Sequence, residues 1–346
     1  MSDPWRADPP LLGDLARITD PVRLVDLDDR GGADPPADRI RIGIATSTLD
    51  ARSRSRAAGL DLTLTPAGTA SGRELVAVDD PETEACRLRA LAETNPQATL
   101  SLAEVLRAAP REVSGGLALE SFAYSTLLGG KEFARWLDER GHRPPPPPAP
   151  RPAVLTERTD DTLRITFDRP ERRNAYGREL RDALVESLRL ALLDPGISRV
   201  VLDGNGPSFS SGGDLGEFGT TPDLATAHFI RTRAGAGALL HELADRVEVH
   251  LHGSCVGAGI ELPAFAGRVL ARDGTTFRLP EVGMGLIPGA GGTVSLPRRI
   301  GRWRTLYLAL SGSALPMQTA LEWGLVDAVE RSEGTPGGSE PPCRSR

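Results

Sequence analysis

The sequence is poor in the features that mark disulfide-bonded, membrane-spanning or nucleic-acid-binding proteins. Only three cysteines occur in 346 residues, and Cys86, Cys255 and Cys343 are too widely spaced to predict a disulfide framework or a zinc site. No stretch approaches the ~20 consecutive apolar residues that a membrane helix needs. The 41 basic residues form no long cluster and the net charge is -6, which argues against a nucleic-acid partner.

The first residues also lack the pattern of a secretory signal. They read MSDPWRADPPLLGDL, with acidic residues and prolines where a signal has a basic segment followed by an apolar one. His228, His241, His250 and His252 have no carboxylate or cysteine at a spacing that completes a metal site. We therefore expect a soluble, cytoplasmic protein that binds neither a metal nor a membrane.

The composition and length of the chain indicate a folded protein with two domains. With 39% hydrophobic and 25% charged residues, the chain can bury a substantial core, and its length favours about two domains. The proline-rich stretch at 144–152 favours an extended, semi-rigid spacer. A ligand for a proline-binding module has a similar composition, but a linker is the simpler interpretation. We predict an N-terminal region at 1–143, the linker at 144–152, a core at 153–330 and a disordered tail at 331–346.

The N-terminal region is predicted to be mainly helical, with strands before the helices. Isoleucines alternate with other residues at 39–47, which is typical of a strand, and 74–78 is a second short candidate. Apolar residues then recur at helical spacing in four segments with prolines between them, where helix boundaries are expected. These segments are 84–93, 100–109, 116–128 and 131–140.

One stretch of the core, 252–293, concentrates the residues suited to chemistry. An alternating pattern at 247–251 predicts a strand that leads into a glycine-rich turn at 257–259. Glu261 and Glu281 follow within the same stretch. Most glutamates are surface acids, but the aliphatic, proline and glycine neighbours of these two are a poor fit to a solvated face. We interpret them as functional.

A second glycine-rich loop can supply a matching hydrogen-bond donor. Residues 209–215 read FSSGGDL and follow an apolar strand pattern at 200–202. Glycines let backbone N–H groups come close to a ligand, and the first turn of a helix after 257–259 has free N–H groups as well. Donors from two separate loops would form an oxyanion hole. Plain turn formation is the alternative.

These motifs resemble the enoyl-CoA hydratase/isomerase (crotonase) family. FSSGGDL, GAGIEL, LPEVGMGLIPGAGGT and the earlier RITFDRPERRNAY stand in the family's order over about half the chain. The resemblance implies an α/β fold with a crotonase-like (ClpP/crotonase) spiral of ββα turns, to which the N-terminal region is added. It also implies an acyl-CoA substrate, no cofactor beyond the coenzyme A of that substrate, and a homotrimer or hexamer.

The resemblance assigns roles to individual residues. The N–H groups of Gly213 and Ala258 would polarise the thioester carbonyl, Glu261 would activate a water, and Glu281 would protonate Cα. Two close carboxylates in an apolar pocket are expected to share one proton near neutral pH. The family often has alanine at Ser211 and Gly213 and glycine at Ala258, but a backbone donor survives either change.

Coenzyme A is expected to contact the loops around the oxyanion hole. We predict these contacts at Ser211, Asp214, Arg172 and Arg173, because the family's turn after the first core strand lies near the pantetheine and phosphates. Two alternatives stay open. The arginines could be ordinary surface residues, and Asp214 could brace its own loop.

The end of the core departs from the family. Typical members continue beyond a motif like GLVDAV, here at 324–329, into helices that cover the acyl-CoA site, whereas a polar Gly/Pro/Ser-rich tail follows here. ELVAVD at 74–79 is similar to that motif, and the segments after it resemble the missing helices. We interpret the N-terminal region as a permuted remnant that covers its own core or a neighbour's. An unrelated helical domain is the alternative.

The sequence therefore predicts an acyl-CoA-processing enzyme that hydrates a trans-2-enoyl-CoA to a 3-hydroxyacyl-CoA. Double-bond isomerisation or thioester hydrolysis on the same scaffold would use one glutamate. A non-catalytic subunit of a larger complex is a third alternative, and the intact glutamate pair argues against it.

Overall fold

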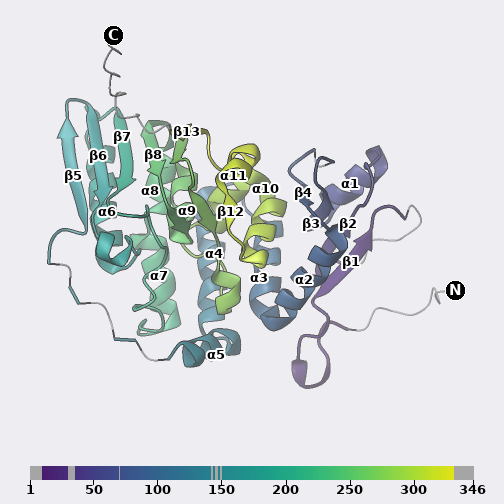
Figure 1. Ribbon diagram of the computed structural model, residues 1–346. Helices are drawn as coiled ribbons and strands as arrows, with labels where there is room; N and C mark the ends of the chain where they lie inside the picture. Colours follow the sequence, from purple (N-terminus) through teal and green to yellow (C-terminus); the bar gives the residue numbers. More distant parts are fainter. Residues whose placement is uncertain are drawn as a thin grey trace, which may run out of the picture.

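The computed structural model places two large sheets on either side of a layer of helices (Figure 1). It describes residues 10–29, 36–69, 71–141, 143–144, 147–148 and 150–330. The tail predicted to be disordered at 331–346, with Cys343, lies outside the described residues.

The core region is built on a six-stranded sheet with the order β13-β10-β8-β7-β6-β5. All neighbours pair in parallel except β5, which runs antiparallel to β6. The central strands are apolar and buried because elements cover both faces of the sheet. The strands are β5 (Val154–Thr159), β6 (Thr162–Phe167), β7 (Arg199–Gly204), β8 (Val247–Leu251), β10 (Arg268–Arg272) and β13 (Ala328–Glu330).

A small second sheet lies beside the first, and the chain passes between the two repeatedly. Its order is β12-β11-β9, formed by β12 (Leu315–Pro316), β11 (Thr276–Arg278) and β9 (Ser254–Val256). The chain steps directly from β8 to β9 and later from β10 to β11. Strands β8 and β10 are parallel neighbours in the large sheet, and β9 and β11 are parallel neighbours in the small sheet. This repetition confirms the spiral of ββα turns that the resemblance implies.

The helices of the core cover the sheets and end in short loops. In α6 leucines at helical spacing face the sheet, with Leu180, Leu184 and Leu188 buried. No helix among the described residues is both long and apolar enough to cross a membrane. The helices are α6 (Arg178–Leu193), α7 (Leu224–Ala234), α8 (Gly237–Glu242), α9 (Ala258–Glu261), α10 (Gly292–Ser311) and α11 (Met317–Trp323), with 3-10 turns at Pro170–Arg172, Ala244–Arg246, Pro263–Phe265 and Glu281–Met284.

The N-terminal region contains more sheet than its sequence predicts. Four parallel strands run in the order β1-β2-β3-β4, of which the sequence indicates only β2 and β4. The sequence of β3, LTLTP, does alternate leucine with threonine, so its strand signal was present but was missed in the sequence analysis. The strands are β1 (Val22–Asp26), β2 (Ile40–Ile44), β3 (Leu62–Pro66) and β4 (Leu75–Val78).

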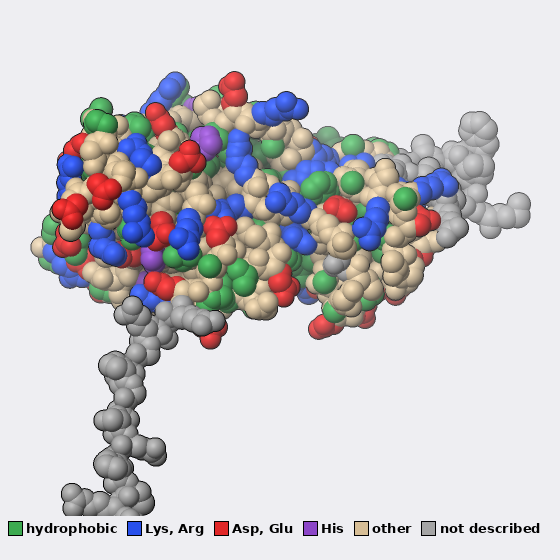
Figure 2. All heavy atoms as spheres, turned by 90° about the horizontal axis from the view of Figure 1, so that it is seen from above, with side chains coloured by type: hydrophobic (Ala, Val, Ile, Leu, Met, Phe, Trp, Pro, Cys, Tyr) green, Lys and Arg blue, Asp and Glu red, His purple; other side chains and the backbone are tan. Residues whose placement is uncertain are grey.

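The helices of this region correspond to the predicted segments, with one addition. A short helix, α1, connects β2 to β3, and a 3-10 turn lies at Asp14–Ala16. Seen from above, acidic and basic side chains are interspersed over the visible face of the molecule (Figure 2). The helices are α1 (Ala51–Gly59), α2 (Pro81–Thr94), α3 (Pro96–Ala108), α4 (Val113–Leu128) and α5 (Lys131–Arg140).

The N-terminal helices pack on the core of the same chain. Both α3 and α4 contact α10, and α4 also contacts α7. The Ser125 hydroxyl donates a hydrogen bond to the carbonyl of Leu224 at the start of α7 (3.0 Å). Of the linker between α5 and β5, the described residues Pro147 and Pro148 lie beside the loop at 214–220. Of the two predicted arrangements, the structure shows the one in which the chain covers its own core; the permutation itself stays a prediction.

One buried carboxylate joins the N-terminal sheet to the core. The side chain of Asp61 is 1% exposed and receives both Nε (2.7 Å) and Nη2 (2.6 Å) of Arg107 from α3. Nη1 of Arg302 from α10 lies 3.5 Å from the same carboxylate, and the backbone N–H of Arg41 donates to it at 2.8 Å. Three cations around one carboxylate therefore fix α3, β2 and α10 against each other.

We expect the Asp61→Asn variant to lose about 3 kcal/mol of unfolding free energy, because it removes the charge of the carboxylate that these partly buried arginines share. Urea unfolding measures this loss. The matched control is Asp182→Asn, whose carboxylate is 55% exposed and pairs with Arg181; we expect it to cost less than ~1 kcal/mol. Equal losses in the two variants would contradict the role given to Asp61.

Candidate active site

Two paired strands deliver the two predicted glutamates to one place. Strands β9 and β11 are parallel neighbours with Val256 opposite Arg278. Glu261 follows β9 by five residues and Glu281 follows β11 by three, so both leave the same edge of the small sheet. The N–H of Gly257 donates to the carbonyl of Arg278 (2.9 Å) and holds the two chain segments together as they leave the sheet.

Glu261 is the last residue of α9 and is 2% exposed. Its Oε2 accepts hydrogen bonds from the N–H groups of Ala290 (2.7 Å) and Gly292 (2.9 Å). Burial raises the pKa of Glu261 well above its ordinary value, and the charges of Glu281 and Glu120 raise it further, against the opposing effect of the two N–H donors. One oxygen is thus fixed by the backbone.

Glu281 begins the 3-10 turn after β11 and is 9% exposed. Its Oε2 is buried and has no hydrogen-bond partner within the described parts of the chain. Burial raises the pKa of Glu281 to about 7, with a smaller contribution from the charge of Glu120. A carboxyl group in this state holds a proton for about half of the time at neutral pH, so it can act as an acid.

The site contains a third carboxylate that the sequence analysis missed. Glu120 comes from the middle of α4, is 2% exposed, and its pKa is raised to about 7 by burial. Its Oε1 accepts from the N–H of Gly291 (2.8 Å), while Oε2 accepts from the N–H (2.8 Å) and hydroxyl (2.7 Å) of Thr293. A signal was present, since Glu120 is the only charged residue in the sixteen of α4.

The turn at 290–293 therefore donates its backbone N–H groups alternately to two acids. Ala290 and Gly292 donate to Glu261, whereas Gly291 and Thr293 donate to Glu120. This turn leads into α10. Its backbone donors offset part of the cost of burying two carboxylates close together.

Two loops place the predicted oxyanion donors at the same cavity. Ala258 is the first residue of α9, after Gly257 at φ +50°, and Gly213 lies in the loop at 209–215. The loops are joined by the N–H of Val256, which donates to the carbonyl of Ser210 (3.1 Å). Within the described residues, neither the Gly213 nor the Ala258 N–H donates to a backbone carbonyl, and both residues line the cavity.

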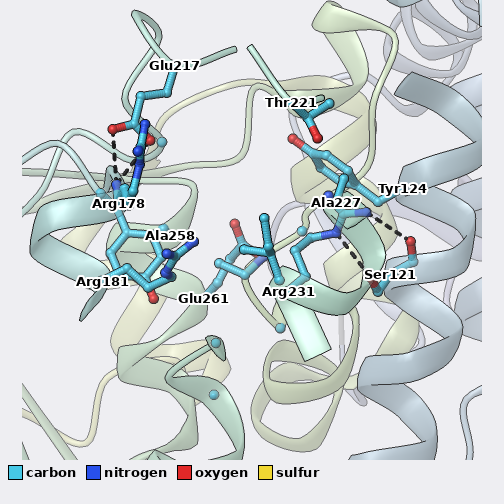
Figure 3. A pocket seen from close by; sticks show the side chains of 18 of the residues that line it. Ser121, Tyr124, Arg178, Arg181, Glu217, Thr221, Ala227, Arg231, Ala258 and Glu261 are labelled. Carbon is cyan, nitrogen blue, oxygen red and sulfur yellow. Dashed lines mark hydrogen bonds between the residues drawn. The ribbon is translucent and has the colours of Figure 1, made fainter. Parts of the chain in front are cut away.

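The cavity itself has a volume of about 550 Å³ and is covered by the N-terminal helix α4. Leu117, Tyr124 and Leu128 of α4 line it together with residues of α7 and the loop at 213–222. Figure 3 shows Arg178 and Arg181 on one side of Ala258. The lining is mostly apolar with a few charged groups, which is typical of a site for an organic ligand.

The residues predicted to contact coenzyme A are only partly at this cavity. Asp214 lines it, but Ser211, Arg172 and Arg173 do not. Asp214 forms a double ion pair with Arg172 (Nη2 to Oδ1 2.7 Å, Nε to Oδ2 3.1 Å) and accepts the N–H of Gly216 (2.9 Å), so it braces its loop. The N–H of Ser211 donates to the carbonyl of Arg173 (2.9 Å). The coenzyme A contacts of these four residues stay a prediction.

Comparison with known proteins shows that the core is similar to enzymes named for reactions of coenzyme A thioesters. Residues 157–334, more than half of the chain, match the family described as Enoyl-CoA hydratase/isomerase. The 2,3-dehydroadipyl-CoA hydratase of Escherichia coli (strain K12) is 36% identical over 182 residues, covering 53% of this chain and 71% of that protein. The 1,2-epoxyphenylacetyl-CoA isomerase of the same strain is 33% identical over 185 residues, covering 52% and 70%. The structure of enoyl-CoA hydratase from Thermoplasma volcanium GSS1 covers 53% of this chain and 73% of its own, with a TM-score of 0.46 and 32% identity.

Gly257 is expected to be irreplaceable because of Glu281. A β-carbon at Gly257 would lie 2.5 Å from Oε1 of Glu281, whereas one at Gly274, also at positive φ, would meet nothing within 4 Å. We expect Gly274→Ala to cost about 1 kcal/mol of unfolding free energy from backbone strain alone, and Gly257→Ala to cost at least about twice as much. Urea unfolding of both variants measures the difference. In the double variant Gly257→Ala with Glu281→Ala part of the excess is recovered; a strictly additive result would contradict the contact.

Proposed function

Because the chain belongs to the enoyl-CoA hydratase/isomerase family, we propose that it hydrates a trans-2-enoyl-CoA to the 3-hydroxyacyl-CoA. The observation that carries this choice is the pair of buried glutamates, Glu261 and Glu281, at one cavity with the N–H groups of Gly213 and Ala258. Addition of water needs a base that deprotonates the water attacking one carbon and an acid that protonates the neighbouring carbon. The site supplies both beside an apolar cavity.

In this mechanism the thioester oxygen accepts hydrogen bonds from the N–H groups of Gly213 and Ala258. Glu261 removes a proton from a water, whose oxygen forms a bond to Cβ as the double bond breaks. The electron pair moves through Cα to the thioester oxygen, and the enolate is held by the two N–H donors. Glu281 then gives its proton to Cα, and transfer of the proton from Glu261 to Glu281 restores the starting state.

Burial raises the pKa of both acids, so the pair holds a shared proton, and hydrogen bonding decides which acid is ionised. Oε2 of Glu261 is held by two backbone N–H groups, which favour the ionised form and leave the other oxygen for a water. Glu281 has no donor on Oε2 in the described structure and a pKa of about 7, which suits an acid at neutral pH. The negative charges of the neighbouring acids prevent all of them from ionising together, so a proton stays in the site.

A second candidate is double-bond isomerisation, since the matching family is described as Enoyl-CoA hydratase/isomerase. Isomerisation moves one proton between two carbons, and a single carboxylate such as Glu281 suffices for it. Thioester hydrolysis on the same scaffold would instead release free coenzyme A. The products separate the three reactions, since only hydration gives a 3-hydroxyacyl-CoA.

We further propose that no cofactor is needed beyond the coenzyme A of the substrate, and that the protein works as a homotrimer or hexamer in the cytoplasm. The support for these points is the resemblance of the core to its family. Light scattering of the purified full chain measures the assembly directly.

We expect Glu261→Gln and Glu281→Gln each to lower kcat by about 10²–10⁴-fold, the range for a general acid or base. The assay is the loss of ultraviolet absorbance of trans-2-enoyl-CoAs of increasing chain length, with the 3-hydroxyl product identified by mass spectrometry. Glu186→Gln, an exposed residue of α6, is the matched control and should keep the wild-type rate. A wild type that binds acyl-CoA without any loss of absorbance would rule out hydration of these substrates.

The rate should depend on pH as a bell with its alkaline limb near pH 7, where Glu281 loses its proton. The charge of Glu120 raises the pKa of both Glu261 and Glu281. Removing that charge in Glu120→Gln lowers both pKa values, so both limbs of the kcat/KM profile move to lower pH. Glu186→Gln should leave the profile in place; an alkaline limb that stays or rises in Glu120→Gln would contradict the coupling.

A further inference from the structure

Arg231 places a guanidinium group at the wall of the active-site cavity. It comes from α7 and is partly buried. Its Nε donates to the hydroxyl of Ser121 (3.1 Å), and Nη2 donates to the carbonyl of Ser121 (3.2 Å) and to the hydroxyl of Ser125. The guanidinium carbon lies 4.6 Å from the centre of the Tyr124 ring. All of these partners belong to α4 and none carries a charge.

The charge of Arg231 has no counter-ion within the described parts of the chain. Its hydrogen bonds to protein use Nε and Nη2, and no acceptor is within reach of Nη1. Glu120 attracts it from a distance, but both oxygens of Glu120 accept hydrogen bonds from Gly291 and Thr293. A partly buried cation with free donors at a cavity wall is costly unless a ligand supplies the anion.

The surroundings of Arg231 are those of an acyl-binding pocket. Leu117, Leu128, Ala227 and Ile230 line the same cavity. Methyl and methylene groups of an acyl chain would be well placed against such side chains. A methyl-ended chain would gain nothing from the guanidinium, whereas a carboxylate-ended one would accept a charge-assisted hydrogen bond from Nη1 of Arg231, which donates to none of the α4 partners.

The positions of the charged groups give a direction to the ligand. In Figure 3 Arg178 and Arg181 lie on one side of Ala258, whereas Arg231 lies beyond Glu261 on the other side, next to Ser121 and Tyr124. A thioester carbonyl at Ala258 would direct the reacting carbons toward Glu261. The rest of the acyl chain would then continue toward Arg231.

We propose that Arg231 binds a carboxylate at the far end of the acyl group, so that the substrates are 2-enoyl-CoAs that end in a carboxylate. This inference rests on the proposed hydration for its reaction, but not for its binding. Arg231 is a specificity-determining residue in this arrangement, since it touches the substrate far from the reacting carbons.

The test compares pairs of trans-2-enoyl-CoAs of equal length that end in a methyl group or in a carboxylate. We expect the wild type to prefer the carboxylate-ended member in kcat/KM. In Arg231→Met the kcat/KM for that member should fall by about 10–100-fold, the worth of a hydrogen-bonded ion pair, while the value for the methyl-ended member is kept or rises. A wild type without the preference, or a variant that loses both substrates equally, would overturn the inference.

Two further variants separate charge from packing. Arg233→Met removes the same charge from an exposed position of α7 outside the cavity lining and should keep the preference. Arg231→Lys keeps the charge and should retain a part of the preference even if Arg231→Met folds poorly, which thermal unfolding would show. A preference that is unchanged in Arg231→Met, or lost in Arg233→Met, would count against a specific site.

Failure of hydration and failure of this inference give different results. Saturated acyl-CoAs that end in a methyl group or in a carboxylate can bind but cannot be hydrated, and calorimetry measures the Kd of each. If no enoyl-CoA is hydrated but the carboxylate-ended ligand binds more tightly and loses this advantage in Arg231→Met, the inference stands and the reaction is wrong. If methyl-ended substrates are hydrated and both saturated ligands bind equally, the reaction stands and the inference is wrong.

Discussion

The burial of two carboxylates on one turn, with a third at the same cavity, is the constraint on which the site depends. Isolated carboxylates are expelled from apolar interiors or become neutral. Here the N–H groups of 290–293 alternate between Glu261 of the core and Glu120 of the N-terminal region. Each acid accepts hydrogen bonds from two of the four N–H groups, so both contribute to the shape of the turn. The N-terminal region is therefore part of the active site as well as its cover.

Further contacts between the N-terminal region and the core lie along α10, away from the site. At its start this helix is held by the turn and Glu120, and further along it meets the N-terminal sheet. There the indole N–H of Trp303 donates to the carbonyl of Leu60 (3.1 Å), next to Asp61 with its arginines. The segment α10 thus contacts both the N-terminal sheet and the acids of the cavity, with a kink between them at Gly301, where φ is +84°.

Much of the core could be predicted from sequence because its signals are local. Glu261 and Glu281 follow short strands and stand among glycines and prolines, so their motifs are visible in one stretch of chain. Glu120 and Arg231 could not be placed this way. The single charge in α4 marks Glu120 as unusual, but only packing of α4 on α7 and α10 brings the two residues to the cavity. Strand β3 could have been predicted, since LTLTP alternates leucine with threonine at the period of a strand.

The hydrogen bonds of Glu120 also bear on how the chain folds as it is made. They join residues 171 and 173 positions apart, and the N-terminal partner leaves the ribosome first. Until the turn at 290–293 is synthesised, α4 carries an unsatisfied acid on the face that will line the cavity. Contacts of such long range slow folding and leave surfaces open in the meantime. The cover of this active site is thus completed last, although its helix is made early.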